Sequence, residues 1–103
     1  MSRKQVVVRV AESAAQDLED IIVWYTSKNV PEVGANLLTR IREHLSQIEL
    51  FPRSGRIVPE YNDPSIRELV IPPFRVVYRL DEARANVVRV WRSERLMLEL
   101  PEE

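Results

Sequence analysis

The sequence predicts an α+β domain in which an antiparallel helical hairpin packs on one face of a mostly antiparallel sheet of three to four strands. A short β-branched run opens the chain, two long segments with helical spacing of apolar residues follow, and three strand-like runs come after them. The connections within the helical part and within the strand part are short, which favours antiparallel neighbours. The predicted order is therefore β-α-α-β-β-β, and residues 1–103 are expected to form one domain.

The N-terminal half supplies one strand and both helices. Residues 5–10, QVVVRV, are predicted as a strand with its even-numbered valines on one face. The first helix is expected from a capping box formed by Ser13 and Gln16 to about Ser27. The second is expected from about Pro31 to Leu50, because proline suits a first helical turn and Pro52 stops the helix. The apolar stripe predicted for this second helix is Ala35, Leu38, Ile41, Leu45 and Ile48.

The C-terminal half supplies the rest of the sheet. Residues 53–64 carry several turn signals and are expected to be irregular. Strands are predicted at residues 65–71, at 74–80 and from 86 to 91 or 92, joined by Pro72-Pro73 and by residues 81–85. In these last two strands the helices should cover Phe74, Val76, Tyr78, Leu80, Val88 and Val90.

The opposite, outer face of the sheet should then be rich in arginine. Alternation places on it Arg75, Val77, Arg79, Val87, Arg89 and Trp91. Arginines interleaved with an aromatic residue suit contacts to phosphates and bases, or to an acidic, amphipathic protein segment. The alternative is a solvated face whose arginines pair with Glu68 or Glu94.

Composition excludes several classes of chemistry. The chain has no cysteine and one histidine, His44, so disulfides, thiolate metal sites and multi-histidine metal sites are excluded, and neither a metal nor a cofactor is expected. The N-terminus has no long apolar run, so neither a signal peptide nor a membrane span is expected, and we expect a cytoplasmic protein.

The charges are unevenly distributed. Fifteen basic and sixteen acidic residues give a net charge of −1. Residues 53–95 nevertheless carry nine arginines against six acids, whereas residues 96–103 carry three acids and no basic residue. A positive sheet region is thus offset by an acidic tail, which indicates a surface for an anionic partner without deciding between protein, DNA and RNA.

A turn and a histidine are further candidates. Arg53 and Arg56 flank Ser54-Gly55 directly after the second helix. A backbone nest with two guanidinium groups would bind an anion there, although a plain turn with solvated arginines fits equally well. His44 could act as a general base, but its position off the apolar stripe of a helix is more typical of a surface residue.

Five segments in order carry a family resemblance. They are AxDLEDI at residues 15–21, FPRSGR at 51–56, IREL at 66–69, PFRVVYR at 73–79 and VxVWRxxR at 88–95. On these the chain resembles toxins of the RelE/ParE superfamily from type II toxin–antitoxin modules. The resemblance implies the fold predicted above, and a cognate antitoxin whose acidic or amphipathic C-terminal segment folds onto the helical hairpin and the adjoining sheet.

The resemblance also bears on the target. RelE-like members are ribosome-dependent endoribonucleases, and ParE-like members poison DNA gyrase. Arg75 matches the strand arginine of the nucleases, but Ile66 and Glu68 stand at their two preceding basic positions. Ser93 and Glu99 fall near the positions of their C-terminal arginine and acid/base residue. The ParE-like branch is closer, although Arg92 replaces a frequent histidine and Arg95-Leu96 a frequent Arg-Asp pair.

We therefore expect a ParE-like toxin that binds DNA gyrase, does no chemistry of its own, and needs no membrane or small-molecule substrate. The residues expected to contact its target or antitoxin are Arg53, Arg56, Arg75, Arg79, Arg89, Trp91 and Arg92. One alternative is a ribosome-dependent mRNA endonuclease, with Arg75, Arg53 and Arg56 on the phosphate and Tyr78 or His44 as acid/base. The other is a non-toxic, antitoxin-binding co-repressor subunit.

Overall fold

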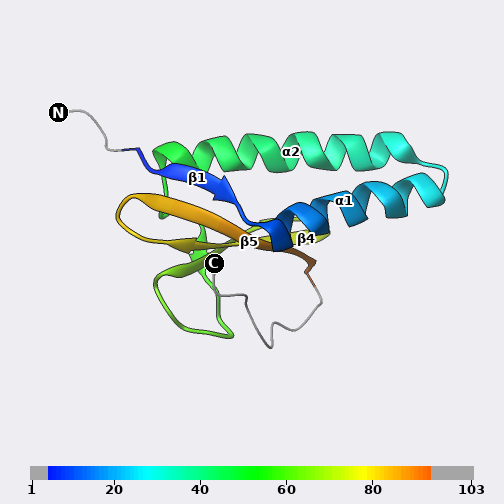
Figure 1. Ribbon diagram of the computed structural model, residues 1–103. Coiled ribbons are helices and arrows are strands. Elements are labelled where there is room, and N and C mark those ends of the chain that lie inside the picture. Colours follow the sequence, from blue (N-terminus) through cyan, green and yellow to red (C-terminus); the bar gives the residue numbers. More distant parts are fainter. Residues whose placement is uncertain (1–4, 94–103) are drawn as a thin grey trace.

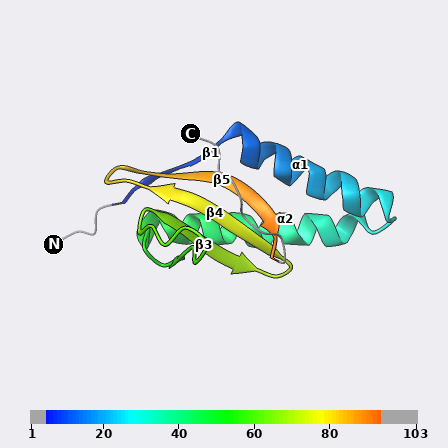
Figure 2. The ribbon, with the colours of Figure 1, turned by 90° about the horizontal axis from the view of Figure 1, so that it is seen from below.

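The structure, a computed structural model, describes residues 5–93 and confirms the α+β class. The elements in chain order are β1 (Val7–Val10), α1 (Glu12–Ser27), α2 (Pro31–Leu50), β2 (Arg56–Ile57), β3 (Ile66–Ile71), β4 (Phe74–Leu80) and β5 (Arg84–Arg92). Both helices lie on one side of a sheet, and the other side faces the viewer when the molecule is seen from below (Figures 1 and 2).

The sheet has five strands in the order β1-β5-β4-β3-β2, rather than the three to four expected. β1 runs parallel to β5, and the other neighbouring strands are antiparallel. The additional strand is β2, a two-residue pairing with β3 inside the segment predicted to be irregular. So short a strand leaves no hydrophobic alternation to detect in the sequence.

α1 begins without the predicted capping box. Ala11 is the N-cap, and Ser13 lies inside the helix, where its Oγ donates to the Val88 carbonyl at 2.6 Å. Gln16 donates instead to the Asp20 carboxylate at 2.9 Å. The prediction was wrong because a carbonyl of β5 offers Ser13 a tertiary acceptor that local spacing does not reveal.

α2 has the predicted bounds but turns a slightly different side to the core. Leu37 is buried and Leu38 only half-buried, while Gly34 is buried and Ala35 exposed. A Cβ at position 34 would lie 3.2 Å from the Tyr25 Cβ of α1, so glycine permits the close approach of the two helices. The stripe is therefore displaced toward α1 in the first turns of α2.

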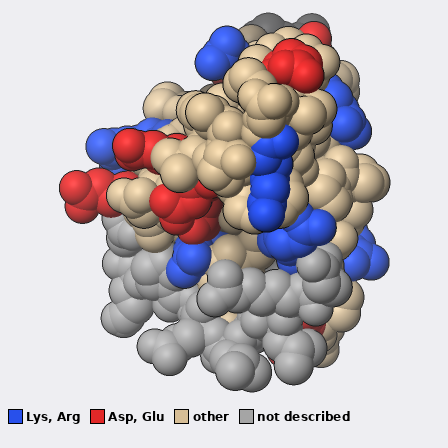
Figure 3. Space-filling model, turned by 90° about the vertical axis from the view of Figure 1, so that its right-hand side faces the viewer, with Lys and Arg blue, Asp and Glu red and all other residues tan. Residues whose placement is uncertain are grey.

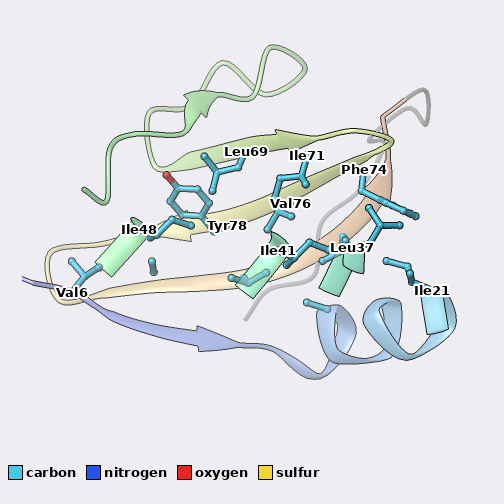
Figure 4. Packing of buried hydrophobic residues seen from close by; sticks show 14 residues of the cluster. Val6, Ile21, Leu37, Ile41, Ile48, Leu69, Ile71, Phe74, Val76 and Tyr78 are labelled. Carbon is cyan, nitrogen blue, oxygen red and sulfur yellow. The ribbon is translucent and has the colours of Figure 1, made fainter. Parts of the chain in front are cut away.

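The main core lies between the helices and the sheet. Figure 4 shows Val76 and Tyr78 of β4 packed toward Ile41 and Ile48 of α2. The remaining buried members of this cluster are Val6, Ala14, Ile21, Leu37, Leu69, Ile71, Phe74, Ala85, Val87 and Val90. Burial of this apolar surface, at roughly 25 cal/mol per Å², is the main force that holds the hairpin on the sheet.

A β-bulge corrects the predicted faces of β5. Val77 pairs with Arg89, but Tyr78 pairs with Val87, so Val88 is an extra residue. Val87 consequently packs in the core beneath the helices, and Val88 packs on the outer side. The prediction reversed these two residues because it assumed an unbroken period of two, whereas Val90 lies on the helix side as expected.

The outer face is not the open surface that was predicted. Val77, Val88 and Trp91 are buried there in a second cluster. The other buried members are Val58 and Ile66, with Tyr61 packed against them. The segment that supplies Val58 and Tyr61 returns to the sheet through a hydrogen bond from Val58 N to Ile66 O at 3.0 Å. A connection predicted as a loop thus covers part of the face on which Trp91 was expected to be exposed.

Candidate partner-binding site

Arg75, one of the residues predicted to contact a partner, is held by two carboxylates on the outer side of the sheet. Its Nε donates to Glu68 Oε1 at 2.6 Å, and Nη1 and Nη2 donate to the two oxygens of Glu60, each at 2.9 Å. The Arg75 side chain is 6% exposed and that of Glu68 fully buried. The hydrogen bonds from Arg75 lower the pKa of Glu60, and the paired carboxylates raise the pKa of Arg75.

Arg56 joins the same cluster from the turn after α2. Its Nε donates to Glu68 Oε2 at 2.6 Å, but its side chain stays 60% exposed. Glu68 therefore accepts from two guanidinium groups, one buried and one facing solvent. Arg75 satisfies a buried charge, whereas Arg56 remains accessible to a partner.

The turn at residues 53–56 is braced from within. The Tyr78 hydroxyl donates to Pro52 O at 2.7 Å and accepts from Gly55 N at 3.1 Å. The Ser54 amide donates to Phe51 O. Because these two amides are engaged inside the protein, the turn does not present the predicted backbone nest to an anion.

Tyr78 is poorly placed for the acid/base role that one alternative gave it. It is buried in the main core, and desolvation raises the pKa of its hydroxyl above the ordinary value. His44, the other candidate, lies on α2 with Nδ1 2.8 Å from the Arg40 carbonyl. The geometry does not bring His44 together with Arg75, because α2 and the outer side of the sheet are on opposite sides of the main core.

Arg89 is engaged by the first helix. Its Nε and Nη2 donate to the two oxygens of Asp17 at 2.8 and 2.9 Å, and the guanidinium lies over the Trp91 ring at 4.4 Å from the centroid. Asp17 Oδ2 also accepts from the backbone amide of Val90 at 2.8 Å. One carboxylate thus fixes α1 to the part of β5 that extends beyond its pairing with β1.

A groove lies beside this ion pair, between α1 and the adjacent ends of β4 and β5. It encloses about 290 Å³. Its lining residues are Asp17, Asp20, Ile21, Trp24, Tyr25, Phe74, Val90, Trp91 and Arg92. Trp24 is 48% exposed and packs edge-to-face on Tyr25 at 4.8 Å. Arg92 lies over the Phe74 ring at 5.7 Å.

The groove is amphipathic. Asp17 and Asp20 line it from α1 and Arg92 from β5, with aromatic and aliphatic side chains between them. In the view of this end of the molecule, a group of acidic side chains lies to the left of a column of basic ones (Figure 3). Such a site suits a segment with an apolar face and charged flanks.

The predicted residues therefore fall into separate places. Arg53, Arg56 and Arg92 are exposed, and Arg79 and Arg89 are half-buried. Arg75 and Trp91 are buried. Sequence reasoning missed the clamping acids Glu60 and Asp17 and the groove. Asp17 did carry a signal, because it stands three residues after Ala14 and four before Ile21, on the side of α1 that faces the sheet.

Two further observations concern the described residues. Within residues 5–93 no group of three histidine or acidic side chains is placed to hold a metal ion. In that same part of the chain, neither helix is long and apolar enough to cross a membrane.

The fold and the sequence together define a toxin of type II toxin–antitoxin systems. Residues 8–97 match the model of the family described as ParE toxin of type II toxin–antitoxin system, parDE. The match covers most of the chain, and the chain belongs to this family of ParE toxins. No match was found among curated protein sequences.

Two solved structures show the same fold. A chain of the chromosomal ParDE TA system from P. aeruginosa is similar with a TM-score of 0.73 at 22% identity, covering 88% of this chain and 99% of that one. A chain of the toxin–antitoxin complex RelBE2 from Mycobacterium tuberculosis is similar with a TM-score of 0.55 at 21% identity, covering 85% and 98%.

Proposed function

We propose that this ParE-family toxin inhibits growth in the cytoplasm by binding DNA gyrase and stalling it with broken DNA, and that a cognate antitoxin neutralises it. The observation that carries the proposal is the double carboxylate clamp on Arg75. RNA cleavage needs a cation on the phosphate and a group that moves a proton. The arginine that matches the nuclease position is neutralised by Glu60 and Glu68, and the Tyr78 hydroxyl is buried.

The exposed arginines are the residues left for target contacts. Arg53 and Arg56 flank the braced turn and are exposed, and the Arg56 side chain is 60% exposed although it pairs with Glu68. A rigid turn presents its side chains to a protein partner with little loss of conformational entropy. We assign the gyrase contact to this turn.

The antitoxin site is the groove beside α1. Its apolar lining suits the hydrophobic face of a helix that folds on binding, and Arg92 and Asp20 offer partners to charges on that helix. Both solved neighbours come from toxin–antitoxin systems, which supports an antitoxin as the partner. Because the groove and the turn at residues 53–56 are separate sites, the antitoxin could bind the toxin without contacting the residues that bind gyrase.

The experiment that tests gyrase as target uses purified gyrase and relaxed plasmid DNA. We expect the toxin to inhibit supercoiling and to accumulate linear DNA after denaturation of the complexes. An Arg53→Gln/Arg56→Gln variant should lose most of this inhibition. Arg40→Gln/Arg42→Gln removes two exposed charges from α2 and should retain it.

Parallel induction in cells distinguishes the alternatives. Prompt translation arrest with messages cut at ribosomes, and no effect on supercoiling, would contradict the gyrase proposal in favour of a nuclease. Undisturbed growth together with antitoxin binding would instead identify a non-toxic co-repressor subunit.

A further inference from the structure

A cluster of three arginines and one asparagine lies at the end of the sheet opposite the groove. Arg9 of β1 pairs with Asn86 of β5, and Asn86 pairs with Arg79 of β4, so the three stand in one row across three strands. Side chains directly opposite each other on paired strands point to the same face. Arg84 stands two residues before Asn86, and therefore on that face as well.

This row lies on the outer face. Its neighbours one residue along, Val8 and Ala85, pair with each other and pack in the main core. Arg9 and Arg84 are exposed, and with Asn86 they line a hollow of about 390 Å³. Figure 2 shows this outer side of the sheet, with the β4–β5 connection and β1 at the same end.

The three arginines are not neutralised as Arg75 and Arg89 are. The ion pairs among residues 5–93 involve Arg56, Arg75 and Arg89, and none involves Arg9, Arg79 or Arg84. The Arg79 Nε is buried without an acceptor in the described part of the chain. A buried donor of this kind is costly unless a ligand or solvent satisfies it.

Two of the nearby acids, Asp63 and Asp81, accept hydrogen bonds from other groups. Asp63, which acts electrostatically on Arg79, accepts from the Ser65 amide and hydroxyl at 2.9 and 2.8 Å. Asp81, near Arg84, accepts from the Ala83 and Arg84 amides. These hydrogen bonds lower the pKa of both carboxyl groups, and neither group closes an ion pair on the row. Glu12 lines the hollow at the start of α1.

The spacing fits a chain of phosphates. Neighbouring strands lie about 4.8 Å apart, so the backbones at Arg9 and Arg79 are roughly 10 Å apart. Two long side chains with this separation reach two different phosphate groups, and each guanidinium can bind one of them bidentately. The Asn86 amide between them adds a neutral donor.

The chemistry favours a duplex over a single strand or a peptide. Single strands bind on exposed aromatic rings, and Trp91, the aromatic residue predicted on this face, is 6% exposed. An acidic peptide that folds on binding needs apolar anchors, and the groove that supplies them is at the other end of β4 and β5. Without base stacking or apolar anchors, the site can contact only phosphates, and phosphate contacts do not discriminate between nucleotide sequences.

We propose that Arg9, Arg79 and Arg84, with Asn86, bind the phosphodiester backbone of a nucleic-acid duplex without sequence specificity. The proposal goes beyond gyrase as the target, because it concerns direct contact between this chain and the duplex. DNA and RNA duplexes share this chemistry, and the experiment separates them.

The test measures fluorescence anisotropy of labelled 20-base-pair duplexes of DNA and RNA, and of a single strand, titrated with the free toxin between 25 and 200 mM salt. We expect micromolar binding to a duplex at low salt, weaker binding to the single strand, and a steep loss with salt. Arg9→Gln/Arg79→Gln/Arg84→Gln should bind at least ten-fold more weakly. Its slope of log affinity against log salt should fall by about 2 to 3, near 0.9 for each lost contact.

A charge-matched control is available on the helical hairpin. Lys28→Gln/Arg40→Gln/Arg42→Gln also removes three exposed positive charges and should bind within about two-fold of the wild type. If the triple change destabilises the fold because Arg79 is half-buried, Arg9→Gln/Arg84→Gln changes exposed residues only and should lower the slope by about 2.

The outcomes decide the proposal. The proposal is overturned if the control variant loses as much duplex affinity as the triple variant, or if the wild type binds no duplex. It is also overturned if the wild type binds poly-glutamate as tightly as a duplex, or prefers the single strand. Binding to one duplex alone identifies the source of the phosphates. The supercoiling assay of the same variants is scored separately, so gyrase inhibition without duplex binding removes only this proposal, and the converse removes only the gyrase proposal.

Discussion

Asp17 of α1 and Arg89 of β5 form a bidentate ion pair with bonds of 2.8 and 2.9 Å between residues 72 positions apart in the chain. The same Asp17 oxygen that meets Arg89 Nε also accepts from the Val90 amide. The Asp17 carboxylate therefore accepts a backbone hydrogen bond at the edge of β5 and also forms an ion pair with it. Together these contacts fix α1, which forms one wall of the groove.

Asp17→Asn should destabilise the protein by about 1–3 kcal/mol, between the values for exposed and for fully buried pairs. The Asp17 side chain is 11% exposed and that of Arg89 25%, so loss of the charge leaves a partly desolvated guanidinium without its counter-ion. Urea unfolding followed by circular dichroism measures the change. Asp20→Asn, at an exposed position of the same helix, should cost less than about 0.5 kcal/mol, and an equal cost for both variants would contradict this role of Asp17.

Arg75→Met should destabilise the fold by about 3–5 kcal/mol because it leaves Glu68 buried with a single, solvent-facing partner. Arg56→Met breaks the exposed pair on the same carboxylate and should cost at most about 1 kcal/mol. Adding Glu68→Gln to Arg75→Met should restore part of the loss. The measurement is again the free energy of unfolding, and a larger effect of Arg56→Met than of Arg75→Met would refute the assignment of Arg75 to the interior.

Tyr78→Phe should cost about 1–3 kcal/mol at neutral pH, since it leaves the buried Gly55 amide without its acceptor. Burial raises the pKa of Tyr78 in the folded protein above its ordinary value of 10.0. The neutral hydroxyl therefore contributes stability below about pH 10, and this contribution is lost as the pH rises through the raised folded pKa.

The difference in stability between wild type and Tyr78→Phe should accordingly shrink in thermal melts as the pH rises above about 10. Tyr25→Phe, which removes the hydroxyl of a half-buried tyrosine on α1, serves as the control. A difference that grows with pH would show that the Tyr78 hydroxyl ionises more readily in the fold than outside it.

Trp24→Ala should weaken antitoxin binding by at least ten-fold while leaving the fold intact, because Trp24 lines the groove and is already 48% exposed in the free toxin. Val23→Ala changes an adjacent side chain that is 60% exposed and does not line the groove, and it should alter affinity by less than about two-fold. Titration calorimetry with the protein encoded beside the toxin measures both. Loss of affinity in Val23→Ala but not in Trp24→Ala would place the antitoxin elsewhere on α1.

Much of the fold was predictable because local signals and tertiary packing agree. β4 has the predicted bounds since its alternating apolar residues are closed by Pro73 and by Asp81. α2 likewise begins at a proline and ends before Pro52. Where a tertiary partner competes, the local signal fails: Ser13 has the spacing of a cap but donates to a carbonyl of β5.

The site was less predictable because it depends on contacts between distant segments. Arg75 has the alternation of an outer-face residue, and it does lie on that side of the sheet. Its burial depends on Glu60, which comes from a connection without regular structure. The bulge at Val88 adds a residue to β5 that the alternation of apolar residues does not predict. This extra residue determines which valine of β5 faces the helices.

The position of β5 between β1 and β4 has a consequence for how the toxin folds. β5 is the last strand among residues 5–93, yet it lies between β1 and β4 and holds α1 through Asp17. A ribosome that has not yet released residue 92 has produced two helices and a partial sheet in which β1 has no neighbour. A nascent chain therefore cannot pair β1 with the rest of the sheet until residues 84–92 are available, so the pairing of β1 is a late step in folding.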